Sequence, residues 1–199
     1  KTWSDAGLPA VDEGWIFDSG GDHQDAFFRA RQASSDNQSP GLYDLSSYRK
    51  FELEFSEADW LTQMTTNYGT ETNVTASLKV DGMLLEGVGV RFKGDTSFRP
   101  ATTLKKSFNI EIDATDPDLR LLGYKTLNLN NAFTDPSFMR EVLYNNFCRQ
   151  YIPSPQANFV HLSINGEAYG VYVNSQQESG DFIKEFFQDN DGDRFRAGI

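Results

Sequence analysis

The sequence predicts an α+β fold in which an antiparallel sheet of hairpins carries two to three helices on one face. Segments with the period-two alternation of half-buried strands outnumber helical segments. Two-residue turns of the Asp-Gly and Asn-Gly type, at Asp81-Gly82 and Asn165-Gly166, join neighbouring strands. Strands joined by such short turns pair antiparallel, and we therefore expect the few helices to cover one side of the sheet.

The composition is that of a folded, acidic globular protein. Of 199 residues, 38% are hydrophobic and 14% aromatic, and the formal net charge is −11. This length allows one domain with a sizeable core. The surplus of acid argues against nucleic acid as a partner, and the absence of a stretch of about 18 apolar residues argues against a membrane span. The first residue is Lys1, with neither an initiator Met nor a signal peptide, which is typical of a mature, processed or excised piece.

Two regions of the chain differ in pattern. Residues 1–48 are rich in Gly, Ser and Pro, and we expect an irregular N-terminal arm there. Residues 49–199 form the predicted domain. The side chains expected to pack the arm over this domain are Trp3, Trp15, Phe17, Phe27 and Phe28.

The strands are predicted from alternation of apolar and polar residues. They cover residues 50–55, 72–80, 88–93, 107–112, 125–130, 158–164 and 169–174.

Three helices are predicted from their start signals. Ser56 and Asp59 resemble a capping box before a helix through Trp60. Asp135, as N-cap before Pro136, starts a second helix that ends near Tyr151. Its expected core-facing residues are Met139, Val142, Leu143 and Phe147. A short third helix follows Ser179 or Asp181.

A cationic loop joins the third and fourth predicted strands. Five cations fall between residues 91 and 106 with Asp95 as the only acid, namely Arg91, Lys93, Arg99, Lys105 and Lys106. Backbone N–H groups of the Gly94–Ser97 loop, together with Lys and Arg, suit a phosphate or a carboxylate. The sequence therefore predicts an anion site, and the alternative is a basic hairpin neutralised by acids elsewhere in the fold.

Other chemistry is not indicated. The patterns of a P-loop, a nucleophile elbow, a zinc protease and an ordinary protein-kinase catalytic loop are missing. Two histidines and the single Cys148 make a zinc site improbable. The Asp189–Asp193 run fails the EF-hand pattern and is interpreted as a turn. No metal ligand and no catalytic residue are assigned.

Several motifs in one order resemble the spore-coat CotH family of atypical kinases. The loop at residues 91–97 is similar to the family's Arg-Gly-Asn-Ser-Ser loop, and Lys105-Lys106-Ser107-Phe108 opens the next strand. Further matching segments are residues 127–131, 135–141, 155–160 and 164–172, and a helix before residues 190–193. Together they extend over residues 84–196.

The resemblance implies a kinase-like fold that binds ATP and Mg²⁺ and phosphorylates secreted or coat proteins, with this chain similar to the N-lobe. It implies nucleotide or phosphate contacts from Arg91, Lys93, Gly94, Asp95, Thr96, Ser97, Lys105 and Lys106. Either Lys105 or Lys106 would neutralise phosphate and be held by Glu141, and the spacing leaves open which one. The implied partners are a protein substrate or a carboxy-terminal half, and the implied location is extracellular or at the cell surface.

Two departures from the family pattern bear on activity. Asn174-Ser175-Gln176-Gln177 stands where the family often has Asn-Val-Glu-Gln, so an amide replaces a carboxylate. The catalytic aspartates of the family lie further along than Ile199, which leaves open whether this chain is a transferase. The alternative function is a non-catalytic extracellular structural or adhesion module acting in surface assembly.

Overall fold

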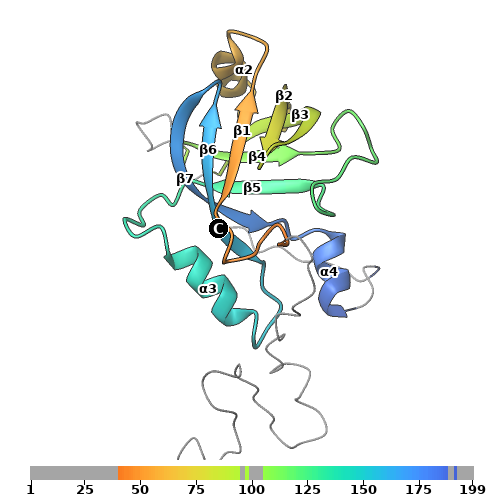
Figure 1. The fold of residues 1–199 in the computed structure, drawn as a ribbon, viewed down its shortest axis with the longest axis vertical. Coiled ribbons are helices and arrows are strands. Elements are labelled where there is room, and N and C mark those ends of the chain that lie inside the picture. The colour runs from red at the N-terminus through yellow and green to blue at the C-terminus, as the bar shows by residue number, and fades with distance from the viewer. Residues whose placement is uncertain (1–39, 95–96, 99–104, 188–190, 192–199) are drawn as a thin grey trace, which may run out of the picture.

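The strands close into a barrel. The computed structural model describes residues 40–94, 97–98, 105–187 and 191, and in this part of the chain seven strands surround the barrel in the order β1-β2-β3-β4-β5-β7-β6 (Figure 1). The strands are β1 (Arg49–Glu54), β2 (Val74–Val80), β3 (Met83–Lys93), β4 (Ser107–Glu111), β5 (Thr126–Asn130), β6 (Ala157–Ile164) and β7 (Glu167–Gln176).

The predicted α+β fold, an antiparallel sheet with helices on one face that resembles a kinase N-lobe, is wrong. β1 pairs antiparallel with β2 and parallel with β6, with Arg49 opposite Val160 and Leu53 opposite Ile164. Because β1 has a neighbour on each side, the sheet has no edges and is a closed, mixed barrel. Such a barrel fills its interior with its own side chains, so it does not need a layer of helices on one face.

Three short helices lie in the described part of the chain, and they sit at the ends of the barrel. They are α2 (Trp60–Thr66), α3 (Arg140–Cys148) and α4 (Gly180–Phe187). Figure 1 shows α2 at one end of the barrel and α3 and α4 at the other. The predicted capping box of α2 is wrong, because its N-cap residue Asp59 makes no side-chain capping bond and instead accepts a hydrogen bond from Gln63 Nε2 at 2.7 Å.

The barrel interior is apolar. Alternate residues of each strand point inward, as in β2, where exposed or half-buried positions separate four buried ones. The fully buried side chains of the core include Phe51, Leu53, Leu78, Val90, Phe108, Ile110, Leu127, Leu129, Leu162 and Tyr172.

Both predicted two-residue hairpin turns are confirmed. Asp81 and Gly82 have φ values of 48° and 95°, and Asn165 and Gly166 have φ values of 49° and 81°. Two consecutive positive φ values are typical of the type I′ turn, whose twist matches that of the flanking strands. These turns join β2 to β3 and β6 to β7.

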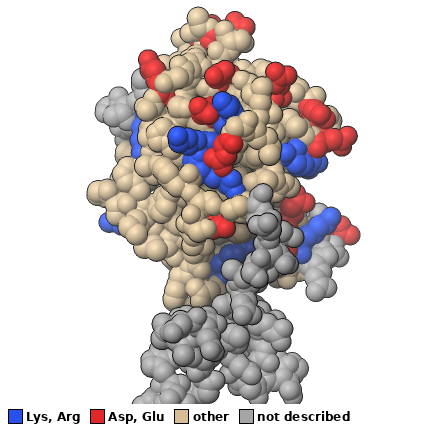
Figure 2. All heavy atoms as spheres, viewed as in Figure 1, with Lys and Arg blue, Asp and Glu red and all other residues tan. Residues whose placement is uncertain are grey.

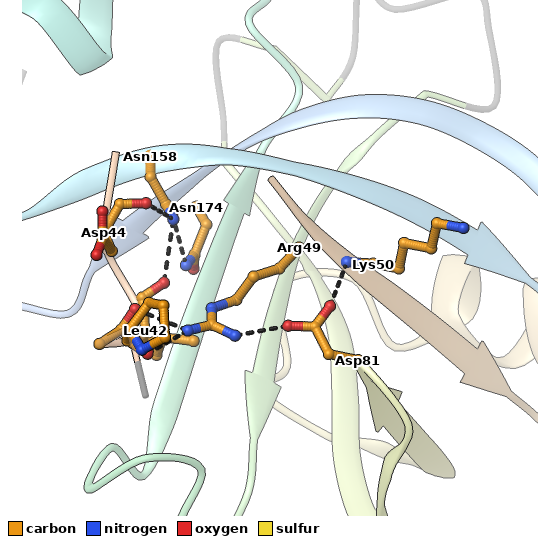
Figure 3. Close-up of polar contacts among 9 residues, drawn as sticks. Leu42, Asp44, Arg49, Lys50, Asp81, Asn158 and Asn174 are labelled. Carbon is orange, nitrogen blue, oxygen red and sulfur yellow. Dashed lines mark hydrogen bonds and ion pairs between the residues drawn. The ribbon is translucent and has the colours of Figure 1, made fainter. Parts of the chain in front are cut away.

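The segment before β1 is fastened to the barrel by buried polar contacts (Figure 3). Asn158 on β6 donates from Nδ2 to the carbonyl oxygens of Leu42 at 3.0 Å and Asp44 at 3.4 Å. Its Oδ1 accepts a hydrogen bond from Asn174 Nδ2 at 3.1 Å. Leu42 and Tyr43 are thereby held in the core, where both are buried.

Arg49 forms a second fastening in the same region. Its Nη1 lies 2.5 Å from Asp81 Oδ2, and its Nη2 donates to the carbonyls of Pro40 and Gly41 (Figure 3). The second oxygen of Asp81 accepts from the Lys50 backbone N–H at 3.0 Å. The turn between β2 and β3 is therefore tied to the segment in which the described chain begins.

Two sequence predictions remain predictions. The packing of Trp3, Trp15, Phe17, Phe27 and Phe28 and the turn at residues 189–193 lie outside the described residues, except for Asp191. The proposed domain boundary at residue 48 is likewise untested. None of the described helices combines the length and the apolar character needed to cross a membrane.

Candidate functional site

A polar cavity of about 500 Å³ opens where β3, β4 and β5 meet the first turn of α3. It is an open hollow at the ends of these strands. The lining residues are Lys93, Gly94, Ser97, Ser107, Asn130, Asn131, Ala132, Phe133, Thr134, Asp135, Arg140 and Glu141. A second hollow of about 320 Å³ shares Ala132, Thr134 and Asp135 with it and adds Pro136 and Phe138.

The loop between β5 and α3 is strained. Ala132, Thr134 and Phe138 have φ values of 53°, 64° and 60°, in the left-handed region that residues with a side chain rarely adopt. Such a conformation costs about 1–2 kcal/mol per residue and persists only where surrounding contacts fix it. All three residues line one of the two hollows, so the strain is concentrated at the candidate site.

Asn131 provides one set of these contacts. Its backbone N–H donates to Ser107 Oγ at 3.1 Å, and its Nδ2 donates to the Lys105 carbonyl at 2.8 Å. Its Oδ1 accepts from the Phe133 backbone N–H at 3.2 Å. The buried Asn131 side chain thus joins the start of β4 to the loop.

Asp135 provides the other set. Its Oδ1 accepts from the backbone N–H of Ser137 at 3.1 Å and from its hydroxyl at 2.6 Å, and its Oδ2 accepts from the Arg140 backbone N–H at 2.9 Å. These hydrogen bonds, the Ser137 hydroxyl first, lower the pKa of the Asp135 carboxyl below its ordinary value.

The predicted start of the second helix is wrong by four residues. α3 begins at Arg140, and its N-cap position is Met139, which makes no side-chain capping bond. The Asp135 carboxylate still accepts a hydrogen bond from the first helical N–H, that of Arg140. It does so from a turn before the helix, which it forms with Ser137. The chain between Asp135 and Arg140 is consequently loop rather than helix and forms the wall of the cavity.

Four of the predicted site residues line the first hollow: Lys93, Gly94, Ser97 and Glu141. Lys93 Nζ donates to Asn128 Oδ1 at 3.0 Å, and Glu141 Oε1 accepts from Asn130 Nδ2 at 2.7 Å. Gly94 has φ 86°, and its carbonyl accepts from the Tyr68 hydroxyl at 2.6 Å. A glycine adopts this left-handed φ, directly after the end of β3, without the strain that a side chain would add.

Arg91, Lys105 and Lys106 are not among these lining residues, and Arg99 lies outside the described residues. Arg91 Nη1 is 2.5 Å from Glu111 Oε1 and 3.0 Å from Asn73 Oδ1. Lys106 Nζ donates to the Phe98 carbonyl at 2.7 Å. Among the described residues, no ion pair joins Glu141 to Lys105 or Lys106. The nucleotide roles of Arg91, Lys105 and Lys106, and the lysine-holding role of Glu141, stay predictions, and Asp95 and Thr96 lie outside the described residues.

Lys105 reaches toward the second hollow. Its ammonium lies 4.0 Å from the centre of the Phe138 ring and 5.2 Å from that of Tyr172. Burial lowers the pKa of Lys105, because removal from water disfavours the charged form. Of the two lysines that sequence spacing left open, Lys105 contacts the cavity loop, and Lys106 packs on Phe98.

Sequence reasoning missed the amides and the hydroxyl that shape the cavity. Asn130 and Asn131 follow the last apolar residue of β5, and Ser107 begins β4. The sequence signal for these residues is their position at strand ends. It identifies a site only if the strands are known to be paired, as β4 and β5 are, because pairing brings the strand ends together.

Charge at the cavity is mixed. Lys93 and Arg140 line the cavity together with Asp135 and Glu141, and Arg140 Nε lies 3.5 Å from Asp135 Oδ1. On the face drawn in Figure 2, acidic side chains gather toward the α2 end of the barrel, and basic ones lie nearer its middle beside acidic neighbours. Within the described residues no group of three His, Cys, Asp or Glu side chains is arranged to hold a metal ion.

The fold and the site define a class: a closed barrel domain with a cavity, lined by polar and charged residues, where three of its strands end. Comparison with known proteins identifies the family. The chain belongs to the CotH family, because the family model described as CotH kinase protein matches residues 90–198. This range contains every residue that lines the first hollow, and the predicted family resemblance is confirmed.

One relative is the inner spore coat protein H-like protein of Bacillus subtilis (strain 168). It is 46% identical to this chain over 55 residues, which are 27% of this chain and 18% of that protein. The matching segment therefore spans less than a fifth of the relative's length.

Proposed function

We propose that this chain is the nucleotide-binding portion of a CotH-type protein kinase of the spore coat or cell surface, and that the first hollow holds the phosphate groups of ATP. One observation carries the proposal: Lys93, Gly94 and Ser97, from the predicted phosphate loop, line the same hollow as Glu141 on α3. Family membership and the name of the Bacillus relative support the kinase and coat parts of the proposal.

The donors at the hollow suit a phosphate. Lys93 supplies an ammonium, Ser97 and Ser107 supply hydroxyls, and Asn130 supplies an amide. Hydrogen bonds from charged donors to phosphate oxygens are about twice as strong as neutral ones. Lys93 Nζ donates to the uncharged amide oxygen of Asn128 at 3.0 Å, and a phosphate oxygen would be a stronger acceptor than that amide oxygen.

Mg²⁺ would bind in the same hollow, beside the phosphate groups. Proteins usually bind it through one or two carboxylates, with the remaining ligands supplied by phosphate oxygens and water. Asp135 and Glu141 are the two carboxylates at the hollow. Asp135 already accepts three hydrogen bonds, so Glu141 is the residue that we assign to the ion. Bound Mg²⁺ would neutralise phosphate charge, and the chain's own residues would orient the nucleotide.

Thermal unfolding with and without nucleotide tests this proposal. A ligand at one hundred times its Kd stabilises the folded state by about 2.7 kcal/mol, so we expect Mg²⁺-ATP to raise the Tm. Lys93→Met should remove most of this shift. The matched control is Lys79→Met, because Lys79 lies on neighbouring β2, outside the cavity lining. An unchanged Tm in the parent protein at millimolar Mg²⁺-ATP would contradict nucleotide binding.

A second function is favoured by a different observation. Arg91, one of the predicted phosphate ligands, is already neutralised by Glu111 at 2.5 Å and bound to Asn73. This arrangement is that of a structural ion pair on the barrel wall and favours a non-catalytic structural or adhesion module in surface assembly. Such a module would show no nucleotide-dependent change in Tm, so the same experiment separates the two functions.

A further inference from the structure

Helix α3 exposes most of its apolar side chains. Its buried residues are Val142 and Asn145, whereas Leu143 and Phe147 are 58% and 61% exposed. The prediction that Met139, Leu143 and Phe147 face the core is therefore wrong. The helix packs on β6 and β7 through Val142, beside Ala157 and Val173, and turns its other side outward.

The exposed residues form a continuous stripe. Met139, Leu143 and Phe147 are four residues apart, which places each above the next along α3, and Tyr151 follows in the turn after the helix. The Phe147 and Tyr151 rings are 5.2 Å apart, centre to centre. We use the name α3 stripe for the exposed residues of this segment, which are Met139, Leu143, Tyr144, Phe147, Tyr151 and Ile152.

Exposed large hydrophobic side chains are concentrated in the α3 stripe. Six of the thirteen exposed large hydrophobic side chains in the described part of the chain lie between residues 139 and 152. Single exposed apolar residues are ordinary on protein surfaces, but a contiguous group marks a surface that binds something. A docking surface is therefore indicated on the outer side of α3.

The start of the described chain is bound to the strand against which α3 packs. The described chain starts at Pro40, and the carbonyls of Leu42 and Asp44 are bound by Asn158. Asn158 lies on β6, the strand against which α3 packs. Residues 1–39 are joined through Pro40 to a segment that is bound to this strand. Thirty-nine residues can span up to about 130 Å, and α3 is only about 14 Å long, so the segment reaches the stripe easily.

The composition of this segment matches the surface. Its large apolar side chains are Trp3, Leu8, Val11, Trp15, Ile16, Phe17, Phe27 and Phe28. Aromatic side chains bury about 150–250 Å² each and dominate the energetics of such contacts. Tethering also makes the contact intramolecular, with an effective concentration of about a millimolar. We propose that residues 1–39 dock their aromatic side chains on the α3 stripe.

Tryptophan fluorescence of the full chain tests this proposal directly. The three tryptophans are Trp3, Trp15 and Trp60, and Trp60 is buried against Phe55 at 4.5 Å between ring centres. A Trp60→Phe protein therefore reports on residues 1–39 alone. We expect its emission to be blue-shifted relative to tryptophan in water and shielded from iodide quenching. Leu143→Glu, added to it, should shift the emission to the red and expose the tryptophans to iodide.

The chain offers a matched control outside the α3 stripe. Leu84 on β3 is 58% exposed, the same fraction as Leu143, so Leu84→Glu should leave the emission unchanged. Far-UV circular dichroism should be the same for both variants, because both sites are at the surface. Water-like emission in the Trp60→Phe protein, or emission that Leu143→Glu does not change, would overturn the proposal. A concentration-dependent dimer that Leu143→Glu dissociates, without a change in emission, would instead assign the stripe to a second copy and also overturn it.

Discussion

The ammonium of Lys105 lies 4.0 Å from the centre of the Phe138 ring, across the gap between the start of β4 and the loop before α3. Phe138 has a φ of 60°, a strained conformation for an aromatic residue. The contact is a cation–π interaction that favours this placement of the ring. It therefore helps to shape the loop that lines both hollows.

We expect Lys105 and Phe138 to be energetically coupled. A double-mutant cycle with Lys105→Met and Phe138→Leu should give a coupling of about 0.5–1 kcal/mol in the free energy of unfolding, the usual range for partly exposed cation–π pairs. Chemical denaturation measures it. The same cycle with Lys106→Met should give no coupling, because the Lys106 ammonium lies over Phe98. Equal coupling for the two lysines would contradict the assignment.

Asp135 should make stability depend on pH in the acid range. Hydrogen bonds from Ser137 and Arg140 lower the pKa of its carboxyl in the folded state. Its contribution is therefore present above the unfolded pKa of about 3.9 and is lost as the pH falls through the folded pKa. The Tm of the parent should fall more steeply below pH 4 than that of Asp135→Ala. Parallel Tm profiles for the two proteins would show that the carboxylate does not stabilise the loop.

Tyr172 should contribute to a loss of stability at alkaline pH, together with Tyr43, whose pKa burial also raises. The Tyr172 ring is fully buried in the barrel, its hydroxyl has no hydrogen-bond partner among the described residues, and burial raises its pKa. The unfolded chain then ionises first, so stability is lost as the pH rises above about 10. Tyr172→Phe should have a flatter Tm profile above pH 10. At pH 7 the variant should be as stable as the parent or more so, since it removes an unpaired buried hydroxyl. A marked loss of stability at pH 7 would reveal a partner for that hydroxyl.

Asn158 should be more important for stability than its place on a strand suggests. Asn158→Ala removes the donor to Leu42 and Asp44 and the acceptor for Asn174. Leaving such buried groups unsatisfied costs about 1–3 kcal/mol each, which urea unfolding can measure. Ser163→Ala, also on β6 but half-buried, serves as the control and should change stability by less than about 0.5 kcal/mol. Equal effects at the two positions would show that the contacts in Figure 3 do not hold the segment before β1.

The strands could be predicted from the sequence because their signals are local. Alternation of apolar residues located β1, β4 and β5 to within one residue at each end, and the Asp-Gly and Asn-Gly turns fixed two hairpins. The closure of the barrel could not be predicted in this way. It depends on the pairing of Arg49 with Val160, which are more than one hundred residues apart in the sequence. The local alternation of apolar residues does not indicate which distant strand a strand pairs with.

The candidate site was predictable in part for the same reason. Lys93, Gly94 and Ser97 could be found because they lie together in the sequence, whereas Asn130 reaches them only through the pairing of β3, β4 and β5. The face of α3 was misjudged because a spacing of four residues is the same for a buried face and for an exposed docking face. Only the position of Val142 against β6 and β7 decides which side is covered.

The most direct test of the proposed function is calorimetric titration of the full chain with Mg²⁺-ATP. We expect saturable binding at one site, loss of that binding in Lys93→Met, and its retention in Lys79→Met. The absence of binding heat, confirmed at a second temperature, or an unchanged Kd in Lys93→Met, would contradict a phosphate site at the end of β3.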